Sequence, residues 1–137
     1  MGRVMGIDYG LKRTGLAVTD PLRIIASPLE TVRTHTLIAY LQSYCQTEPV
    51  DAFVVGLPKK LDNSDTHITQ AVQAFARTLK NKFPEQQVHL HDERFTSKMA
   101  LEAMIAGGTT KKYRRTKGNI DKVSATIILQ SYLAATS

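Results

Sequence analysis

The stretch Val4-Met5-Gly6-Ile7-Asp8-Tyr9-Gly10-Leu11-Lys12-Arg13-Thr14-Gly15-Leu16-Ala17-Val18 contains two apolar runs separated by a short polar turn. The first run predicts a strand over Val4–Asp8, and the second predicts a strand over Leu16–Thr19. The first strand ends in a carboxylate, and a glycine and the cations Lys12 and Arg13 follow it closely. An apolar strand thus delivers an acidic group to the edge of the core, and the sequence first raises the question of what that group does.

The rest of the chain changes from strands joined by tight turns to strands that alternate with helices. Three strands in a row predict an antiparallel meander, whereas strands that alternate with helices are usually parallel. The sequence therefore predicts an α/β fold in one domain over residues 1–137, with a mixed five-stranded sheet of three antiparallel strands and then two parallel ones, flanked by helices. The further expected elements are a strand over Ile24–Val32 with an edge position or a bulge at Pro28, a helix with its stripe at Leu37, Leu41 and Tyr44, a strand over Ala52–Val55, a helix over Ile68–Phe83, a strand over Val88–Asp92, a helix over Lys98–Ala106, a loop over residues 109–119 and a last helix from Asp121 to Ala134.

The chain is basic, with a net charge of +6 from 18 Lys and Arg against 12 Asp and Glu. Most of the excess lies between Lys111 and Lys122, which favours a local contact with a polyanion such as nucleic acid. Cys45 is the only cysteine, so no internal disulfide can form. No apolar run approaches the roughly 20 residues of a membrane span, and the first strand begins too early for a signal peptide. We therefore expect a cytoplasmic protein with no membrane partner, while protein partners and oligomeric state stay open.

Acidic residues occur where apolar elements meet loops, at Asp8, Asp92, Glu93 and Asp121. If the first and last strands are parallel neighbours, their carboxylates emerge at one edge of the sheet, and the apolar face of the last helix turns Asp121 toward it. Carboxylates that close repel one another, and a divalent cation resolves the conflict. Oxygen ligands favour Mg²⁺ or Mn²⁺ over zinc. Two such ions about 4 Å apart would clamp the attacking and leaving oxygens of a phosphodiester.

Simpler explanations exist for each of these acidic residues. Asp121 could cap the last helix, since Asp is favoured at that position. Asp8 could be a turn residue, and the run Asp92-Glu93-Arg94 could be a solvated charge cluster. His89 and His91 share a strand face, but they lack the third and fourth ligands of a zinc site.

Basic side chains are the candidate nucleic-acid contacts. The cations after the first strand could receive a phosphate, and the segment before Asp121 could close over a nucleic-acid backbone, with Tyr113 stacked on an unpaired base. The alternative in both places is a solvated surface. The candidate contacts are Lys12, Arg13, Arg94, Lys111, Lys112, Arg114, Arg115 and Lys117.

Four segments together resemble the YqgF family of RNase H-fold proteins, over nearly the whole chain. The family is associated with Holliday-junction-resolvase-like enzymes and with nucleases that mature the 5′ end of pre-16S ribosomal RNA. The segments are Gly6-Ile7-Asp8-Tyr9-Gly10 with Lys12-Arg13-Thr14-Gly15, then Val55-Gly56-Leu57-Pro58, then Asp92-Glu93-Arg94-Phe95-Thr96-Ser97, and finally Asp121-Lys122-Val123-Ser124-Ala125-Thr126-Ile127-Ile128-Leu129-Gln130.

The resemblance implies an RNase H-like sheet and a metal-dependent nuclease. It implies that Asp8, Asp121 and either Glu93 or Asp92 are catalytic and bind the metals, and it favours Glu93. Because side chains alternate along a strand, only one of these two adjacent residues should face the site. The implied substrate is pre-rRNA or branched DNA. The competing hypotheses are a non-catalytic nucleic-acid-binding factor and one lobe of a sugar-kinase or actin-type ATPase, whose first phosphate loop the first segment also resembles.

Overall fold

The computed structural model describes residues 2–58, 67–93, 102, 105–108 and 117–136. The polar loop after Pro58, most of the helix expected over Lys98–Ala106 and residues 109–116 lie outside this part of the chain. Its principal elements are β1 (Arg3–Asp8), β2 (Arg13–Thr19), β3 (Ala26–Arg33), a 3-10 turn (Thr34–Thr36), α1 (Leu37–Thr47), β4 (Val50–Pro58), α2 (His67–Lys82), β5 (Gln87–Glu93) and α5 (Lys117–Thr136). Within the described residues, no helix has both the length and the apolar character needed to cross a bilayer.

The five strands form one mixed sheet in the order β3-β2-β1-β4-β5. The β1–β2 and β2–β3 pairs are antiparallel, and the β1–β4 and β4–β5 pairs are parallel. The expected mixed sheet is therefore confirmed. The first and last strands are not neighbours, however, because β4 lies between them. Since adjacent strands are about 4.8 Å apart, β1 and β5 are separated by roughly 10 Å.

Four of the five strands are longer than the apolar runs that predicted them, whereas β3 begins two residues later than the expected Ile24 and ends one residue later than the expected Val32. β2 begins at Arg13 and β3 ends at Arg33, and these two residues face each other across the pair. β3 is an edge strand, and the β2–β3 register shifts between Leu16 and Ala17, where Ala17 faces Pro28. The edge position and the bulge expected at Pro28 are both present.

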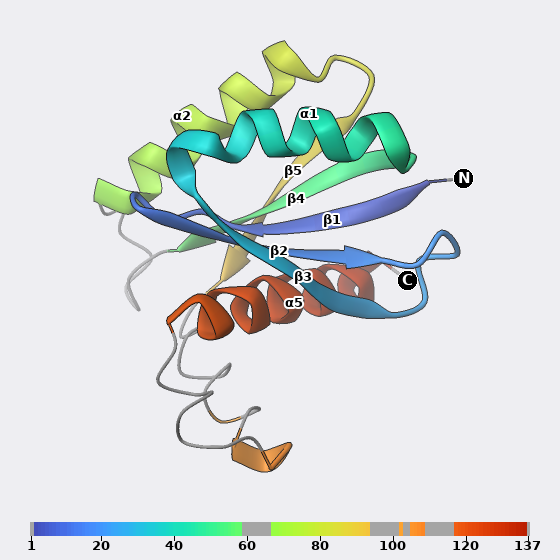
Figure 1. Cartoon of the computed structure of the whole chain (residues 1–137), viewed down its shortest axis with the longest axis vertical. Coiled ribbons are helices and arrows are strands. Elements are labelled where there is room, and N and C mark those ends of the chain that lie inside the picture. The colour runs from blue at the N-terminus through green and yellow to red at the C-terminus, as the bar shows by residue number, and fades with distance from the viewer. Residues whose placement is uncertain (1, 59–66, 94–101, 103–104, 109–116, 137) are drawn as a thin grey trace.

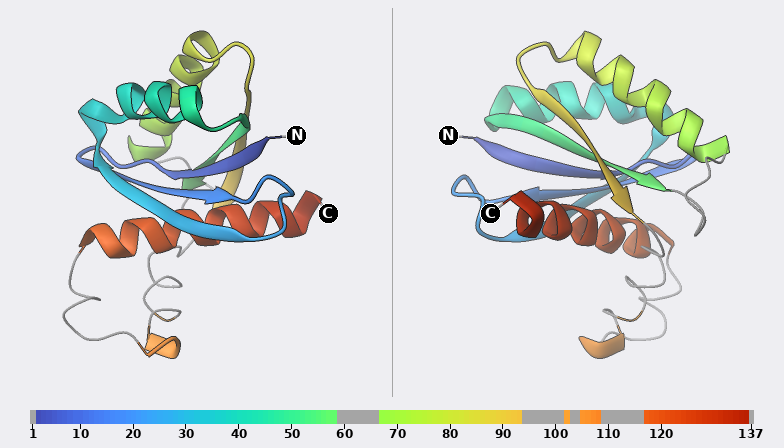
Figure 2. Two further views of the ribbon diagram at one scale, coloured as in Figure 1. Left: turned by 45° about the vertical axis from the view of Figure 1, so that its right-hand side comes forward. Right: turned by 180° about the vertical axis from the view of Figure 1, so that it is seen from behind.

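Helices cover the two faces of the sheet separately. Figure 1 shows α1 and α2 above the strands and α5 below them, and Figure 2 shows the same three layers in an oblique view and from behind. One core lies between the sheet and α1 and α2, and a second lies between the sheet and α5. The first core includes Met5, Ile7, Leu16, Leu37, Leu41, Phe53, Val55, Val72, Phe75 and Leu79, and the second includes Val4, Ala17, Val54, Ala125, Ile128 and Leu129.

The last helix begins four residues earlier than the sequence pattern indicates. α5 starts at Lys117, so the expectation of a loop through residue 119 is wrong for its last three residues. Asp121 consequently lies inside the helix, and its predicted alternative role as an N-cap is wrong. Glycine and asparagine are poor helix formers, but a tertiary contact supports this first turn, since the Thr31 hydroxyl donates a hydrogen bond to the Gly118 carbonyl at 2.5 Å.

Glycines on the sheet allow α5 to approach the strands closely. A Cβ atom at Gly6 would lie 2.8 Å from the Ala125 carbonyl oxygen and 2.9 Å from the Leu129 Cβ. A Cβ at Gly15 would collide with the backbone of Asp121. Glycine is the only residue that fits such an approach between two backbones.

The variant Gly6→Ala should therefore destabilise the fold. The added methyl group must displace α5, and overpacking of this kind costs about 1–3 kcal/mol. Urea denaturation of the variant and the parent chain measures the difference. Gly118→Ala is the matched control, because its Cβ would meet only Thr31 at an ordinary 3.6 Å, and it should cost nothing. Equal stability of Gly6→Ala and the parent would contradict the close approach.

Candidate active site

Asp8 ends β1 on the face of the sheet that α5 covers. Val4 belongs to the core under α5, whereas Ile7 belongs to the opposite core, and strand alternation therefore assigns Asp8 to the α5 face. The next residue, Tyr9, packs on the other side, where its ring stacks on Phe75 with centroids 4.5 Å apart. This stacking anchors the end of the strand and fixes the direction in which the half-buried Asp8 points.

Asp121 reaches the same place from α5. Asp8 lies directly opposite Gly15 in the β1–β2 pair, and the Cα atoms of such pairs are about 4.5–5.5 Å apart. A Cβ on Gly15 would lie 2.9 Å from the Cβ of Asp121. The missing side chain of Gly15 thus leaves room for Asp121 beside Asp8, and two acidic residues far apart in the sequence come together.

Arg13 forms an ion pair with Asp121. Its Nε donates to the Asp121 Oδ2 at 2.8 Å, and the two side chains are 42% and 21% exposed. An ion pair with this much exposure contributes at most about 1 kcal/mol to stability. The guanidinium has five N–H donors, and this bond uses one of them. Arg13, predicted as a phosphate contact, therefore lies at the border between the acidic pair and the cations of the β1–β2 turn.

The two acidic residues of β5 are adjacent in the strand, so their side chains point to opposite faces of the sheet. The Nε2 of His91 is hydrogen-bonded to the Ser131 hydroxyl at 2.9 Å. The ring centroids of His89 and His91 lie 5.5 and 6.0 Å, respectively, from that of Tyr132. Both histidines therefore face α5. Asp92 is exposed, and strand alternation places it on the face of the sheet opposite to that of the two histidines. The side chain of Glu93 lies outside the described residues, and its backbone is opposite Pro58 of β4.

No metal-binding group of three is found among the side chains that the structure describes, counting His, Cys, Asp and Glu. Lys12 is exposed in the β1–β2 turn. Five of the other predicted nucleic-acid contacts lie outside the described part of the chain, namely Arg94, Lys111, Lys112, Arg114 and Arg115. The backbone of the last one, Lys117, begins α5, but its side chain lies outside the described residues.

A threonine that the sequence analysis did not single out holds the turn after Asp8 in place. Thr34 donates its hydroxyl hydrogen to the Gly10 carbonyl at 2.6 Å and accepts from the buried Thr14 hydroxyl at 2.9 Å. Its backbone N–H also donates to the Lys12 carbonyl at 3.0 Å. Periodicity gives no signal for such a link, because a threonine after an edge strand resembles any other surface threonine.

Ser124 lies one turn after Asp121 in α5. Its hydroxyl is fully buried and has no hydrogen-bond partner among the described residues. Buried hydroxyls are usually satisfied. The second turn of α5 therefore carries both a carboxylate beside the strand ends and an unsatisfied polar atom next to it.

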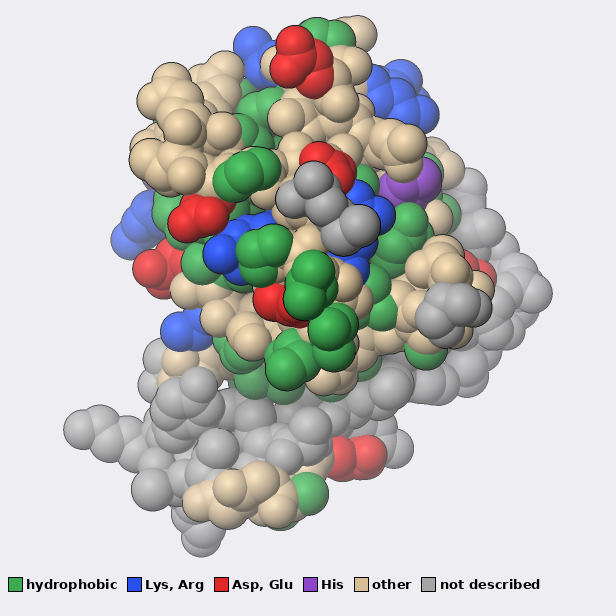
Figure 3. All heavy atoms as spheres, turned by 90° about the vertical axis from the view of Figure 1, so that its right-hand side faces the viewer, with side chains coloured by type: hydrophobic (Ala, Val, Ile, Leu, Met, Phe, Trp, Pro, Cys, Tyr) green, Lys and Arg blue, Asp and Glu red, His purple; other side chains and the backbone are tan. Residues whose placement is uncertain are grey.

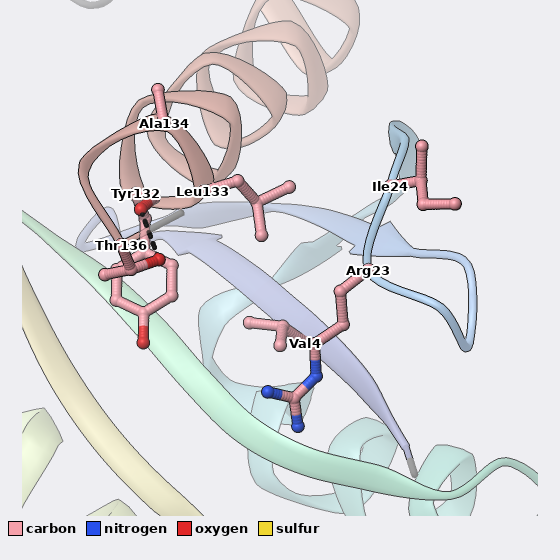
Figure 4. Close-up of a pocket in the computed structure, with 7 residues that line it drawn as sticks. All are labelled: Val4, Arg23, Ile24, Tyr132, Leu133, Ala134 and Thr136. Atoms are coloured by element: carbon pink, nitrogen blue, oxygen red, sulfur yellow. Dashed lines mark hydrogen bonds between the residues drawn. The ribbon is translucent and has the colours of Figure 1, made fainter.

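A cavity lies at the other end of the molecule, away from the acidic pair. It has a volume of about 510 Å³ and is lined by residues from the start of β1, the β2–β3 turn and the end of α5, namely Val4, Arg23, Ile24, Tyr132, Leu133, Ala134 and Thr136. Figure 4 shows these side chains. Exposed Leu22, Ile24 and Ile25 belong to the same turn, and Figure 3 shows hydrophobic side chains gathered on the face toward which this turn projects. None of the predicted site residues lines this cavity.

Comparison with known proteins identifies the family. A family model described as "RuvX: Holliday junction resolvase" matches residues 2–135. The chain belongs to the RuvX family. The resemblance noted from the sequence is thereby confirmed, because RuvX and YqgF denote the same family. A RuvX chain is a nuclease, that is, a phosphodiester hydrolase whose substrate is nucleic acid.

Curated relatives of this RuvX chain carry a more specific name. A protein of Amoebophilus asiaticus named "Putative pre-16S rRNA nuclease" is 54% identical over 135 residues, which are 98% of this chain and 96% of that protein. Proteins of the same name from Christiangramia forsetii and Porphyromonas gingivalis are 49% and 50% identical, each over 97% of this chain and at least 96% of their own length.

Solved structures show the fold of this RuvX chain in other proteins. RuvC of Thermus thermophilus in complex with a Holliday junction substrate matches with a TM-score of 0.58 at 16% identity, over 100% of this chain and 98% of that chain. A second Thermus thermophilus RuvC structure matches with a TM-score of 0.54 at 17% identity, over 98% of this chain and 96% of that chain. The expected RNase H-like sheet is therefore confirmed.

The Thr34 link predicts a measurable loss of stability in Thr34→Val. The nearly isosteric valine leaves the buried Thr14 hydroxyl without its acceptor, and an unsatisfied buried polar group costs about 1–3 kcal/mol. Chemical denaturation measures this cost. Thr136→Val removes one exposed hydrogen bond at the end of α5 and should change stability by less than about 0.5 kcal/mol. A loss no greater in Thr34→Val than in Thr136→Val would show that the link does not hold the turn.

Proposed function

We propose that this chain is a metal-dependent nuclease that processes the 5′ end of pre-16S ribosomal RNA in the cytoplasm, with residues 1–137 acting as one catalytic domain. The single observation that carries the catalytic part is the convergence of Asp8 and Asp121 across Gly15. A domain that only bound a polyanion would gain nothing from two carboxylates at its basic surface, because like charges repel the ligand.

The residues present fit a hard divalent cation. The donors are carboxylate oxygens, which suit Mg²⁺ or Mn²⁺ better than zinc. The absence of a side chain at Gly15 lets the backbone of Asp121 come up against the strand next to Asp8, and the buried Ser124 hydroxyl one turn away has no partner within the described residues. Asp8 and Asp121 would hold the cation together with Glu93. When bound, such ions supply positive charge that stabilises the charge developing on the phosphate oxygens.

Glu93 is the stronger candidate for the third ligand. Positions 89 and 91 of β5 face α5. Because side chains alternate along a strand, position 93 lies on the same face of the sheet as Asp8 and α5, and Asp92 lies on the opposite face. Because β4 separates β1 from β5, a third ligand must also reach across roughly 10 Å of sheet. A glutamate, which is one methylene longer than an aspartate, suits that distance better.

The protein's own side chains would orient the substrate for attack by water. Asp8 and Asp121 are rigidly held, the first by a buried strand and the second by a helix packed on glycines, so little reorganisation is needed when the phosphodiester binds. Arg13 and Lys12 lie beside the acidic pair and would contact phosphate oxygens there. As the water oxygen bonds to phosphorus, the bond between phosphorus and the leaving oxygen breaks. The water gives up a proton to solvent, and the leaving oxygen takes one up from solvent.

The substrate assignment rests on two findings that point to different nucleic acids. The relatives at about 50% identity are named for pre-16S rRNA, whereas the family description names the Holliday junction. We favour RNA because the relatives cover nearly the whole chain at that identity. A cleavage assay of a 5′-extended 16S rRNA precursor against a four-way DNA junction, with the same protein and Mg²⁺ or Mn²⁺, tests the choice. Faster cleavage of the junction would assign the DNA substrate.

Asp8→Asn should abolish cleavage. The amide keeps the shape of the side chain but removes its charge, and loss of such an electrostatic group costs roughly 100-fold or more in rate. Addition of a chelator to the parent protein should have the same effect. Glu85→Gln, which removes an exposed carboxylate in the turn after α2, is the matched control and should cleave like the parent. Full activity of Asp8→Asn would refute the proposed nuclease site.

The two acidic residues of β5 give a sharper test. Glu93→Gln should lose activity by roughly 100-fold or more, whereas Asp92→Asn should retain most of it, because alternation assigns Asp92 to the other face of the sheet. Single-turnover cleavage of the same substrate measures both variants. The reverse result would assign the ligand to Asp92 and would require an irregular end of β5.

A further inference from the structure

Two arginines face each other on neighbouring strands beside the acidic pair. Arg13 of β2 and Arg33 of β3 are directly opposite in the register of the antiparallel pair. Like charges in such positions destabilise a sheet. Asp121 balances Arg13, but neither Arg33 nor Lys12 has a carboxylate partner among the described residues. The fold thus holds together cations that repel one another and that nothing in the described protein fully neutralises.

These cations line a cavity at the start of α5. The cavity has a volume of about 330 Å³, and its lining residues are Lys12, Arg13, Thr31, Val32 and Arg33. Thr31 lies opposite Gly15, and its hydroxyl donates to the carbonyl of Gly118 in the first turn of α5. Arg13, Thr31 and Arg33 therefore share the α5 face of the sheet, and the positive end of the helix dipole is next to them.

The turn and strand that carry the cations are fixed to each other. Thr34 follows Arg33 directly, and it bonds to the Gly10 carbonyl, the Thr14 hydroxyl and the Lys12 carbonyl. These hydrogen bonds fix the position of the Lys12 backbone relative to that of Arg33. A cluster that is ordered before the ligand arrives loses less entropy on binding.

We propose that Lys12, Arg13 and Arg33 form a phosphate-binding subsite, which holds a backbone phosphate of the substrate strand next to the phosphate that is cleaved. The inference rests on the proposed nuclease function and adds Arg33 as a substrate-positioning residue. Guanidinium groups match phosphate oxygens in a two-point geometry, and an anion between the opposed arginines removes their repulsion. The Arg13–Asp121 ion pair connects this subsite to the acidic pair, so one continuous strand of nucleic acid can occupy both.

The test measures binding without cleavage. Arg33→Gln and the parent chain are titrated with a fluorescent 5′-extended 16S rRNA fragment in the presence of chelator, over a range of salt concentrations. Each neutralised phosphate contributes about 0.7–0.9 to the slope of log K against log salt. Arg33→Gln should lower that slope by about this amount and weaken binding about 5- to 10-fold near 0.1 M salt.

A matched control separates the subsite from general charge effects. Arg77→Gln removes one exposed cation from α2, on the opposite face of the sheet, and should leave slope and affinity at the parent values. Equal slopes for Arg33→Gln and the parent, or equal losses in Arg33→Gln and Arg77→Gln, would overturn the inference. Because this assay uses no metal, Asp8→Asn can abolish cleavage while Arg33→Gln changes nothing, and that result would refute the subsite alone.

Thermal unfolding supplies a readout that does not depend on nucleic acid. Inorganic phosphate should raise the Tm of the parent and of Arg77→Gln more than that of Arg33→Gln, at constant ionic strength. Phosphate also stabilises proteins by exclusion from their surface, so the difference between the variants is the relevant quantity. In chloride at low salt, Arg33→Gln should be at least as stable as the parent, because it removes a like-charge pair. An identical phosphate response in all three proteins would contradict the subsite.

Discussion

The site depends on the close contact between the backbone of α5 and the sheet. Three adjacent strands each present a glycine to this helix, namely Gly6 of β1, Gly15 of β2 and Gly56 of β4. A side chain at Gly6 or Gly15 would meet the backbone of α5 and push the helix outward, whereas one at Gly56 would meet the side chain of Ile128. At Gly15, the same push would separate Asp121 from Asp8. The absence of side chains at Gly6 and Gly15 thus allows the close approach that brings two carboxylates from opposite ends of the chain to one place.

The contact also sets the charge distribution at the ends of the strands. Carboxylates lie where β1 meets α5, and cations lie where β2 and β3 meet the first turn of the same helix. The Arg13–Asp121 ion pair is the border between them. A phosphodiester chain carries negative charge at every nucleotide, so it needs cations along its path and a metal-binding acidic group only where it is cut. Under the proposed function, the two halves of this surface would provide those two functions in adjacent positions.

Patterns of apolar residues predicted the elements well, because burial of a strand or of a helix stripe is a local property. Ends of elements were predicted less well. The start of α5 was missed because Gly118 and Asn119 have low helix propensity, and a contact with Thr31 from another strand outweighs that preference. Arg33 was missed for a related reason. In the sequence it is one cation at the end of an extended run, and only the register of β2 and β3 places it opposite Arg13.

The sequence by itself determined the fold class and the family, and it indicated the candidate catalytic residues: acidic groups at the ends of apolar elements. The tertiary structure alone decided how they are combined. It placed β4 between β1 and β5, and it placed Asp92 on the face of the sheet opposite to that of Asp8. It also brought Arg13 into an ion pair with Asp121 and set it opposite Arg33 in the strand register. The physical reason is that strand order and register come from packing between distant segments, and a pattern of neighbouring residues contains no information about which distant segments will meet.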